Sequence, residues 1–194
     1  MFNKIALVVL FFAVAFCFTQ VTPVSAATTP SLGAADTFGI VAGTYINTVA
    51  GTTINGDAGW TTGPAVVPAG GPFTGAGALT ATARTDAGAA LTNLNAQPCT
   101  FSFAAGAINL ATDTTHGPIG VYTPGVYCTT TAAGAMSIGT AGITLSGAGT
   151  YIFRTSAPSN ALTSAANSVV TLANGASSCD VFWTPTAATT LGAK

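Results

Sequence analysis

The sequence predicts a mostly β chain that winds into an irregular β-solenoid, with one α-helix packed alongside. Three observations support this prediction. Short runs of β-branched and aromatic residues recur in a loosely periodic way, one segment alone has an apolar stripe of helical period, and only 5% of the 194 residues are charged. Ordinary soluble proteins contain roughly 25% charged residues. Because 49% of the residues are hydrophobic, apolar burial favours folding over disorder.

The N-terminal segment, residues 1–26, has the pattern of a secretory signal peptide. Lys4 precedes an apolar run over residues 5–18, and Val24-Ser25-Ala26 has the small residues of a cleavage site. A membrane anchor is the weaker interpretation, because the run is shorter than the ~20 apolar residues that a span needs. We therefore expect a secreted, extracellular protein without membrane contact after cleavage, in which residues 27–194 form one domain.

The first expected strand lies in the stretch TFGIVAGTYINT. Phe38 and Ile40 alternate toward the interior there, with Ile46 on the next face. Further on, Asn55-Gly56 predicts a tight turn, because both central positions of a type I′ turn need positive φ.

Residues 77–97 are expected to form a helix. Apolar residues recur there at steps of three and four, which gives one stripe: Leu79, Ala83, Ala87, Ala90, Leu91 and Leu94. Pro98 prevents the helix from continuing. The small alanines let the helix lie close to another surface, such as a face of the solenoid.

Three cysteines remain once Cys17 leaves with the signal peptide. In an oxidising compartment an odd number predicts one disulfide and one spare thiol. Cys99–Cys128 is the preferred pair, and Cys179 is interpreted as a buried, inert cysteine. Three cysteines and one histidine at these distances do not resemble a zinc site, so no metal is expected.

The second half of the chain contains a loose repeat. YIFRTSA, from Tyr151, aligns with VFWTPTA, from Val181, and ITLSGAG, from Ile143, aligns with VTLANGA, from Val170. VYCTTTA, from Val126, aligns with the same YIFRTSA stretch. Short strands with Gly, Asn and Ser corners at this spacing indicate stacked coils. Alternation places Met136, Ile138, Ile143 and Leu145 inside.

The sequence does not support an enzyme. The chain has five Asp and no Glu, whereas glycoside hydrolysis normally needs two carboxylates that flank the bond. The repeat does not bring two Asp residues to one face, and His116 beside Asp113 is more simply a loop residue. Nucleophile, phosphate-binding and metal motifs are absent from the sequence, as is a basic patch for nucleic acid. We therefore expect no cofactor.

A Thr-rich, almost uncharged outer face suggests another role. Thr carries a methyl and a hydroxyl on a stiff stem, so a grid of Thr, Ser and Ala holds an ordered water layer. Ice is the partner that accepts such a layer with least rearrangement. Thr is also common in strands generally, so composition alone does not decide between ice binding and an ordinary β protein.

Four stretches carry a resemblance to a known family: LGAADTFGIVAGTYINT, TTINGDAGW, DTTHGPIGVYTPGVYC and ALTSAANSVVTLANGASSCDVFWTPTAATTLG. Over residues 32–192 the chain resembles the microbial ice-binding (antifreeze) proteins with a discontinuous β-solenoid. The resemblance implies a right-handed solenoid of triangular section with a long helix alongside. It also implies adsorption to ice crystals through one flat face, which inhibits ice growth and recrystallisation. We expect a monomer.

Matching the family's strands points to an ice-binding face on both halves of the chain. The predicted residues are Thr44, Asn47, Thr48, Thr129, Thr131, Asn160, Thr163, Thr186 and Thr189. Leu162 is expected in the core. A slip of one residue would reverse each inward and outward assignment.

Members of this family usually continue past the TLG of the last stretch, so we expect the C-terminal coils to be truncated here. Two alternatives to ice binding remain. A carbohydrate-binding or adhesive solenoid at a microbial cell surface would show an aligned row of exposed aromatic residues. A degraded polysaccharide lyase would show Asp and Arg clustered in a groove.

Overall fold

The computed structural model describes residues 26–44, 53–67, 69–73, 78–130, 134–156 and 158–192. The predicted signal peptide, apart from Ala26, lies outside these ranges, as do Ile46 and the predicted site residues Asn47, Thr48 and Thr131. Within the described ranges, no helix combines the length and the hydropathy that crossing a membrane requires.

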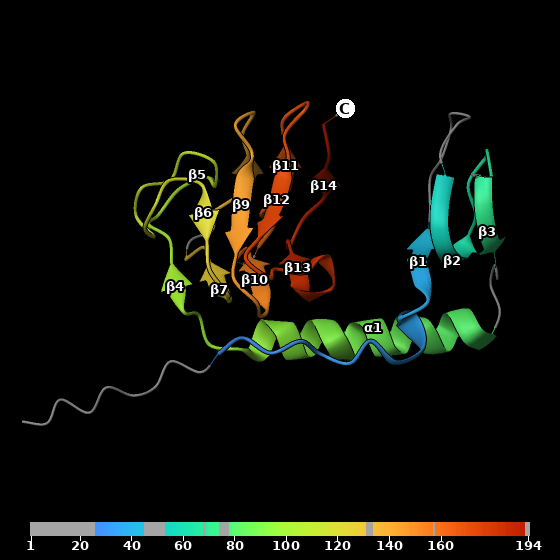
Figure 1. The fold of residues 1–194 in the computed structure, drawn as a ribbon. Coiled ribbons are helices and arrows are strands. Elements are labelled where there is room, and N and C mark those ends of the chain that lie inside the picture. Colours follow the sequence, from blue (N-terminus) through green and yellow to red (C-terminus); the bar gives the residue numbers. More distant parts are fainter. Residues whose placement is uncertain are drawn as a thin grey trace, which may run out of the picture.

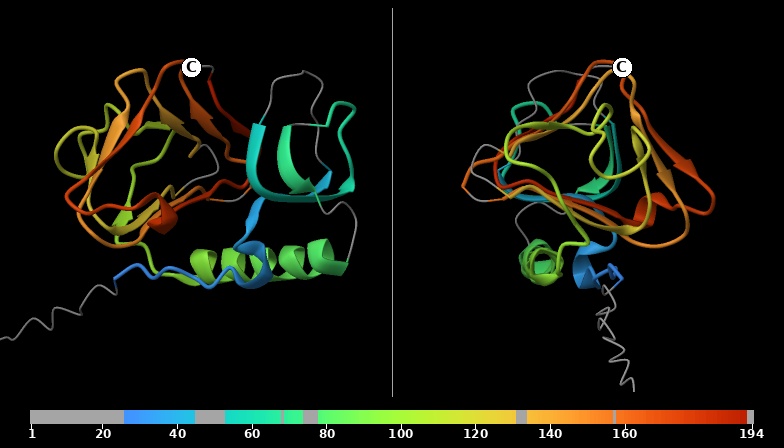
Figure 2. Two further views of the ribbon diagram at one scale, coloured as in Figure 1. Left: turned by 45° about the vertical axis from the view of Figure 1, so that its right-hand side comes forward. Right: turned by 90° about the vertical axis from the view of Figure 1, so that its left-hand side faces the viewer.

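Three parallel sheets form the solenoid (Figures 1 and 2). Each of the first three coils contributes one strand to each sheet, and the fourth coil contributes a strand to two of them within the described residues. The helix face consists of β4 (Phe101–Ser102), β7 (Gly125–Cys128), β10 (Tyr151–Arg154) and β13 (Val181–Thr184). The small-residue face consists of β5 (Ile108–Asn109), β8 (Met136–Ile138), β11 (Leu162–Ser164) and β14 (Thr189–Thr190). The groove face consists of β6 (Val121–Tyr122), β9 (Ile143–Ser146) and β12 (Val170–Ala173). Seen along its axis, the solenoid is triangular (Figure 2, right).

The strand registers confirm two of the three predicted repeat alignments. Tyr151 pairs with Val181, and Ile143 pairs with Val170. The third alignment was wrong by one position, because Tyr151 pairs with Gly125 and not with Val126. The observed register turns Val126 outward beside Ile152, toward the helix.

An aromatic column runs through the core along the solenoid axis. Phe101, Tyr127, Phe153 and Trp183 occupy the same register position on successive coils. The Phe153 ring stacks on Tyr127, with centroids 5.2 Å apart, and on Trp183, with centroids 4.3 Å apart. Of the residues predicted to point inward, Met136, Ile138, Ile143, Leu145 and Leu162 are buried. Phe38 and Ile40 of the first expected strand are only half-buried. Period-2 alternation therefore identified the core strands of the solenoid correctly.

A fourth parallel sheet, separate from the three sheets above, precedes the helix. It consists of β1 (Phe38–Thr44), β2 (Thr53–Thr62) and β3 (Ala69–Phe73), and the short 3₁₀ segment η1 (Gly33–Ala35) leads into it. The predicted turn at Asn55-Gly56 was wrong, because both residues lie within β2. β2 pairs with β1 on one side and β3 on the other, and the register shifts between Asn55 and Ala58. Strand neighbours supply backbone partners there that a local turn would otherwise have to provide.

The predicted helix is α1 (Ala78–Ala96), which runs along the molecule beneath the solenoid and the sheet of β1, β2 and β3 (Figure 1). Its buried residues form a narrow stripe of period three and four: Thr80, Ala83, Ala90 and Leu94. Leu91, predicted to belong to this stripe, is 46% exposed. Leu94 packs against Val126 and Ile152 on the helix face.

Arg154 fastens the end of α1 to the solenoid. Its Nη1 donates to the carbonyl oxygens of Leu94, Asn95 and Gln97, at 3.3, 2.6 and 3.0 Å. A cation at this place also complements the negative end of the helix dipole. Burial lowers the pKa of the guanidinium.

The chain leaves the helix through a disulfide. Cys99 is bonded to Cys128 of β7, with their Cα atoms 5.9 Å apart, as in the preferred pairing. Cys179, expected to be buried, is instead an exposed free thiol. It lies in the 3₁₀ segment η2 (Ser178–Asp180), which forms a corner of the last coil.

Candidate functional site

The three faces of the solenoid differ in what they can offer to a partner. On the helix face, the outward residues Val126 and Ile152 are fully buried and pack against Leu94 of α1. The helix therefore covers this face, and only the other two faces are open.

The groove face is uneven. Ile119 and Val169 are 61% and 56% exposed and lie at the rim of a hollow of about 300 Å³. Gly142 lies in this hollow with φ +69°. A Cβ there would collide with the Val169 carbonyl oxygen, so glycine is required and the hollow has no side chain to fill it. Because side chains project around a hollow, this face cannot lie flat against a crystal surface.

The small-residue face carries a regular outward column. Asn109, Ser137, Thr163 and Thr190 occupy one register position on four successive strands. Their inward neighbours Met136 and Leu162 are 1% and 5% exposed, which fixes the outward direction of the column. One small polar side chain per strand therefore repeats at the rung spacing of a parallel sheet, about 4.8 Å.

A second outward column consists of alanine alone. Continued back by one position beyond β5, β8 and β11, the same registers align three methyl groups: Ala107, Ala135 and Ala161. Backbone hydrogen bonds from Ile108 to Ala135 and from Met136 to Ala161 continue the ladder there. β5, β8, β11 and β14 contain no charged residue. The face therefore presents small, uncharged side chains.

The outward column divides into a fixed half and a free half. The Asn109 side-chain oxygen accepts from the amides of Ala111 and Gly139, both at 3.1 Å, and the Ser137 hydroxyl donates to the Ile108 carbonyl at 3.2 Å. Within the described part of the chain, the Thr163 and Thr190 hydroxyls make no hydrogen bond, and both residues are exposed. These two hydroxyls are available to bind water.

The structure separates the predicted site residues. Thr163 lies on the small-residue face, whereas Thr44 is exposed at the end of β1, in the sheet that precedes the helix. Thr186 is exposed at a corner, but its hydroxyl donates to the Ser156 carbonyl oxygen at 3.0 Å. Thr189 shares a register with Leu162, which places it in the inward column.

Two predicted residues are buried at the corner between the helix face and the small-residue face. Thr129 and Asn160 are each 4% exposed. The Thr129 hydroxyl accepts from the Ser156 amide at 2.8 Å, and the Asn160 side chain donates to the Ser156 carbonyl at 2.7 Å. Both residues satisfy backbone groups at a bend, so we remove them from the candidate face.

Sequence reasoning missed three members of the outward column: Asn109, Ser137 and Thr190. The signal was present for Thr190. Because Leu162 was expected inside, Thr163 had to point outward, and the correct alignment of TTL with LTS pairs Thr190 with Thr163. Choosing Thr189 was a slip of one position, which reverses the face.

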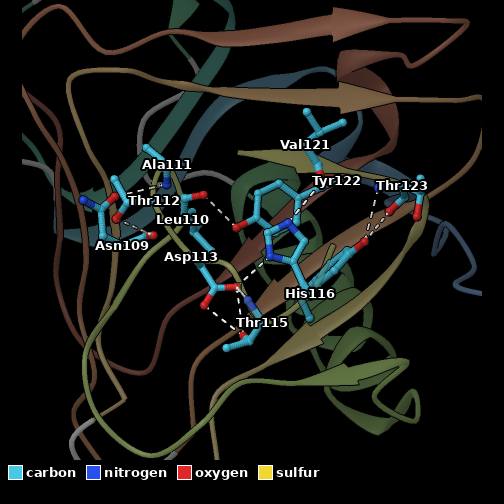
Figure 3. A network of polar contacts seen from close by, with 11 residues as sticks. Asn109, Leu110, Ala111, Thr112, Asp113, Thr115, His116, Val121, Tyr122 and Thr123 are labelled. Atoms are coloured by element: carbon cyan, nitrogen blue, oxygen red, sulfur yellow. Dashed lines mark hydrogen bonds and ion pairs between the residues drawn. The ribbon is translucent and has the colours of Figure 1, made fainter. Parts of the chain in front are cut away.

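His116 lies in the loop between β5 and β6, where it takes part in a closed polar network (Figure 3). Its Nδ1 lies 2.6 Å from Asp113 Oδ2, and its Nε2 lies 3.0 Å from the Val121 carbonyl oxygen. The ring stacks on Tyr122 with centroids 4.0 Å apart, and its side chain is 2% exposed. Because both ring nitrogens are engaged and buried, this pair fits a structural role in the loop that covers the end of the core.

Burial and hydrogen bonds act on the pKa values of this network in different directions. Burial would by itself raise the pKa of Asp113, but hydrogen bonds from His116 and Thr115 outweigh it and lower that pKa. Burial also raises the pKa of Tyr122, whose hydroxyl donates to the Leu110 carbonyl oxygen at 2.8 Å. Among the residues that the structure places, no three His, Cys, Asp or Glu side chains are arranged to hold a metal ion.

Comparison with known proteins agrees with this architecture. A model of the ice-binding-like family matches residues 39–194. No curated protein matches the chain by sequence. Among solved structures, an ice-binding protein from the Antarctic ascomycete Antarctomyces psychrotrophicus is 25% identical, with a TM-score of 0.68 over 85% of this chain and 78% of that one.

Two further structures are similar. An ice-binding protein from an Antarctic bacterium, Flavobacteriaceae, is 26% identical, with a TM-score of 0.58 over 84% of this chain but only 37% of that one. An ice-binding protein from an Arctic yeast is 24% identical, with a TM-score of 0.65 over 84% of this chain and 76% of that one, and it supports the fold.

Proposed function

The chain belongs to the ice-binding-like family, and from this premise we propose that it binds ice through the small-residue face. The single observation that carries the choice of face is the outward column of Asn109, Ser137, Thr163 and Thr190. Of the two faces that α1 leaves open, this one has small uncharged side chains and the other is hollowed.

The chemistry of the column suits a water layer. The free hydroxyls of Thr163 and Thr190 lie on neighbouring rungs, about 4.8 Å apart. Each can anchor one water molecule, while the Thr methyls and the alanine column beside them cannot hydrogen-bond and leave the remaining waters bonded to one another. β-branching restricts the Thr rotamers, so little side-chain entropy is lost on contact.

The scarcity of charge supports the same proposal. A charged side chain on the face would keep its own hydration shell, which a crystal lattice would have to displace. Adsorbed molecules leave the ice free to grow only between them, as curved fronts. Such fronts stop growing at temperatures below the melting point, which produces thermal hysteresis and slows recrystallisation.

The sugar-binding alternative lacks its characteristic feature. Among the side chains whose exposure the structure describes, no Phe, Tyr or Trp is exposed, and Trp183 stacks on Phe153 inside the solenoid. The lyase alternative lacks its cluster, because Arg154 is engaged with carbonyl groups of α1 and Asp113 with His116. We infer a non-catalytic, cofactor-free monomer that is secreted after cleavage near Ala26.

The direct test is a nanolitre osmometer measurement on purified residues 27–194, with circular dichroism on the same sample. A gap between melting and freezing temperatures, together with faceted crystals, is the expected result. A folded β protein that produces no gap and leaves crystals round would contradict ice binding. Albumin at equal mass concentration is the control for non-specific effects.

A further inference from the structure

The disulfide between Cys99 and Cys128 has one accessible and one buried end. Cys99 is exposed, in the segment between α1 and β4, whereas Cys128 is 3% exposed at the end of β7. A thiolate exchanges with a disulfide by attacking one of its two sulfurs, so the reaction requires access to that sulfur. Cys99 is therefore the residue that a thiol in solution can reach.

A guanidinium group contacts both sulfurs of this disulfide. Nη2 of Arg154 lies 2.9 Å from Cys99 Sγ and 3.2 Å from Cys128 Sγ. Arg154 and Cys128 occupy the same register position on the neighbouring strands β10 and β7, so strand pairing fixes this contact. A cation beside a sulfur stabilises the thiolate, which is the form that leaves when a disulfide opens.

Arg154 is held in place by groups other than the sulfurs. Its Nη1 donates to the carbonyl oxygens of Leu94, Asn95 and Gln97. Within the described residues no carboxylate pairs with the guanidinium, so its charge is not neutralised. Burial by itself disfavours a thiolate at Cys128. The fixed positive charge offsets this cost, and it needs no rearrangement while the negative charge develops.

The backbone beside the disulfide is paired independently of the cross-link. The Thr100 amide donates to the Val126 carbonyl oxygen at 2.9 Å, and β4 pairs with β7 immediately after it. These contacts keep the two cysteines close together when the cross-link opens. The disulfide can therefore open without unfolding of the solenoid, and the released thiolate can close it again.

We propose that Cys99 is a site of reversible thiol–disulfide exchange with small thiols, in which Arg154 stabilises the leaving thiolate. The thiolate of the small thiol attacks Cys99 Sγ and forms a mixed disulfide. The Cys99–Cys128 bond breaks, and its electron pair leaves on Cys128 Sγ. Attack of this thiolate on Cys99 Sγ reverses the step and releases the small thiol. One disulfide replaces another, so the exchange needs no further oxidant or reductant.

The experiment measures exchange with reduced glutathione under native conditions. The protein is residues 27–194 with Cys179→Ser, so that Cys99 and Cys128 are its only cysteines. Acid quenching, alkylation of free thiols with N-ethylmaleimide and peptide mass spectrometry give the rate of exchange and the sulfur that carries glutathione. We expect glutathione on Cys99 and the alkyl group on Cys128.

Variants of Arg154 separate charge from packing. Arg154→Met should slow the exchange by about threefold to tenfold, and Arg154→Lys should restore most of the rate. Arg154→Met also loosens α1, which by itself would speed the exchange, so a slower rate isolates the effect of the charge.

Leu94→Ala is the matched control. It loosens the packing of α1 against the cluster that contains Cys128 and changes no charge, so its rate should equal or exceed that of the wild type. In urea, where these contacts are lost, wild type and Arg154→Met should react equally fast.

Three results would each overturn the proposal. The folded protein could form no glutathione adduct, or the adduct could lie on Cys128. Arg154→Met could also exchange as fast as the wild type or faster, which would show that its charge does not assist the leaving thiolate.

Discussion

The choice of face can be tested with one substitution, Thr163→Tyr. Thr163 lies at the centre of the outward column, between Ser137 and Thr190, and is exposed without an intramolecular hydrogen bond among the described residues. A tyrosine there would raise a rigid ring above side chains that are all smaller. A flat, rigid partner cannot close around it.

The expected loss follows from the area that the ring would hold away from ice. Three rungs and the two outward columns around Thr163 cover roughly 200 Å² at the spacings of a parallel sheet. At about 25 cal/mol per Å² this area corresponds to about 5 kcal/mol, or more than a thousandfold in affinity. We expect thermal hysteresis to fall at least tenfold. The melting temperature should barely change, because an exposed strand position accepts Tyr and Thr about equally.

The matched control is Thr171→Tyr. Thr171 is also an exposed threonine of the third coil, but it lies on the groove face, in register with Thr144. Both variants are compared with the wild type in the osmometer at equal concentration and by thermal unfolding. Retained hysteresis in Thr163→Tyr together with loss in Thr171→Tyr would show that the groove face binds ice and that flatness was the wrong criterion.

Three predictions concern the scaffold, each checked by urea unfolding. Leu145→Ala should destabilise the protein by about 2–5 kcal/mol, because Leu145 is 0% exposed between two coils; a cost below about 1 kcal/mol would show that the coils repack freely. Arg154→Met keeps an unbranched apolar stem but leaves three carbonyl groups of α1 without their donor. We therefore expect the free energy of unfolding to fall by about 2 kcal/mol and α1 to fray by circular dichroism, both partly restored in Arg154→Lys. Equal stability of Arg154→Met and Arg154→Lys would contradict a hydrogen-bonding role. Burial would raise the pKa of Asp113, but hydrogen bonds from His116 and Thr115 lower it in the folded state. The ionised carboxylate therefore stabilises the fold at pH values above the pKa of the unfolded state. This stabilisation is lost as the pH falls through the pKa of the folded state. Wild type should therefore lose more stability than Asp113→Asn between about pH 5 and about pH 2, and parallel curves would refute this.

Sequence alone determined the architecture because local patterns encode it. The alternation in MSIGTAGITL places Met136 and Leu145 inside wherever the strand is paired, and both are buried. The stripe that ends before Pro98 defined α1 to within one position at each end. Side chains repeat with a period of 2 in a strand and 3.6 in a helix because of the backbone geometry itself. These patterns can therefore be recognised in the sequence without knowledge of the tertiary structure. The family resemblance was also carried by sequence alone.

Only the tertiary structure decided which threonines form a face. Thr129 and Thr163 were both predicted to lie on the ice-binding face, yet Thr129 is buried at a corner and Thr163 is exposed. Thr189 and Thr190 differ by one position and face opposite sides because pairing with β11 sets their register. Corners of variable length lie between the strands, and each extra residue reverses side-chain parity. Register is fixed by contacts between coils that are distant in sequence, such as the pairing of β10 with β7 and with β13, which no local pattern specifies.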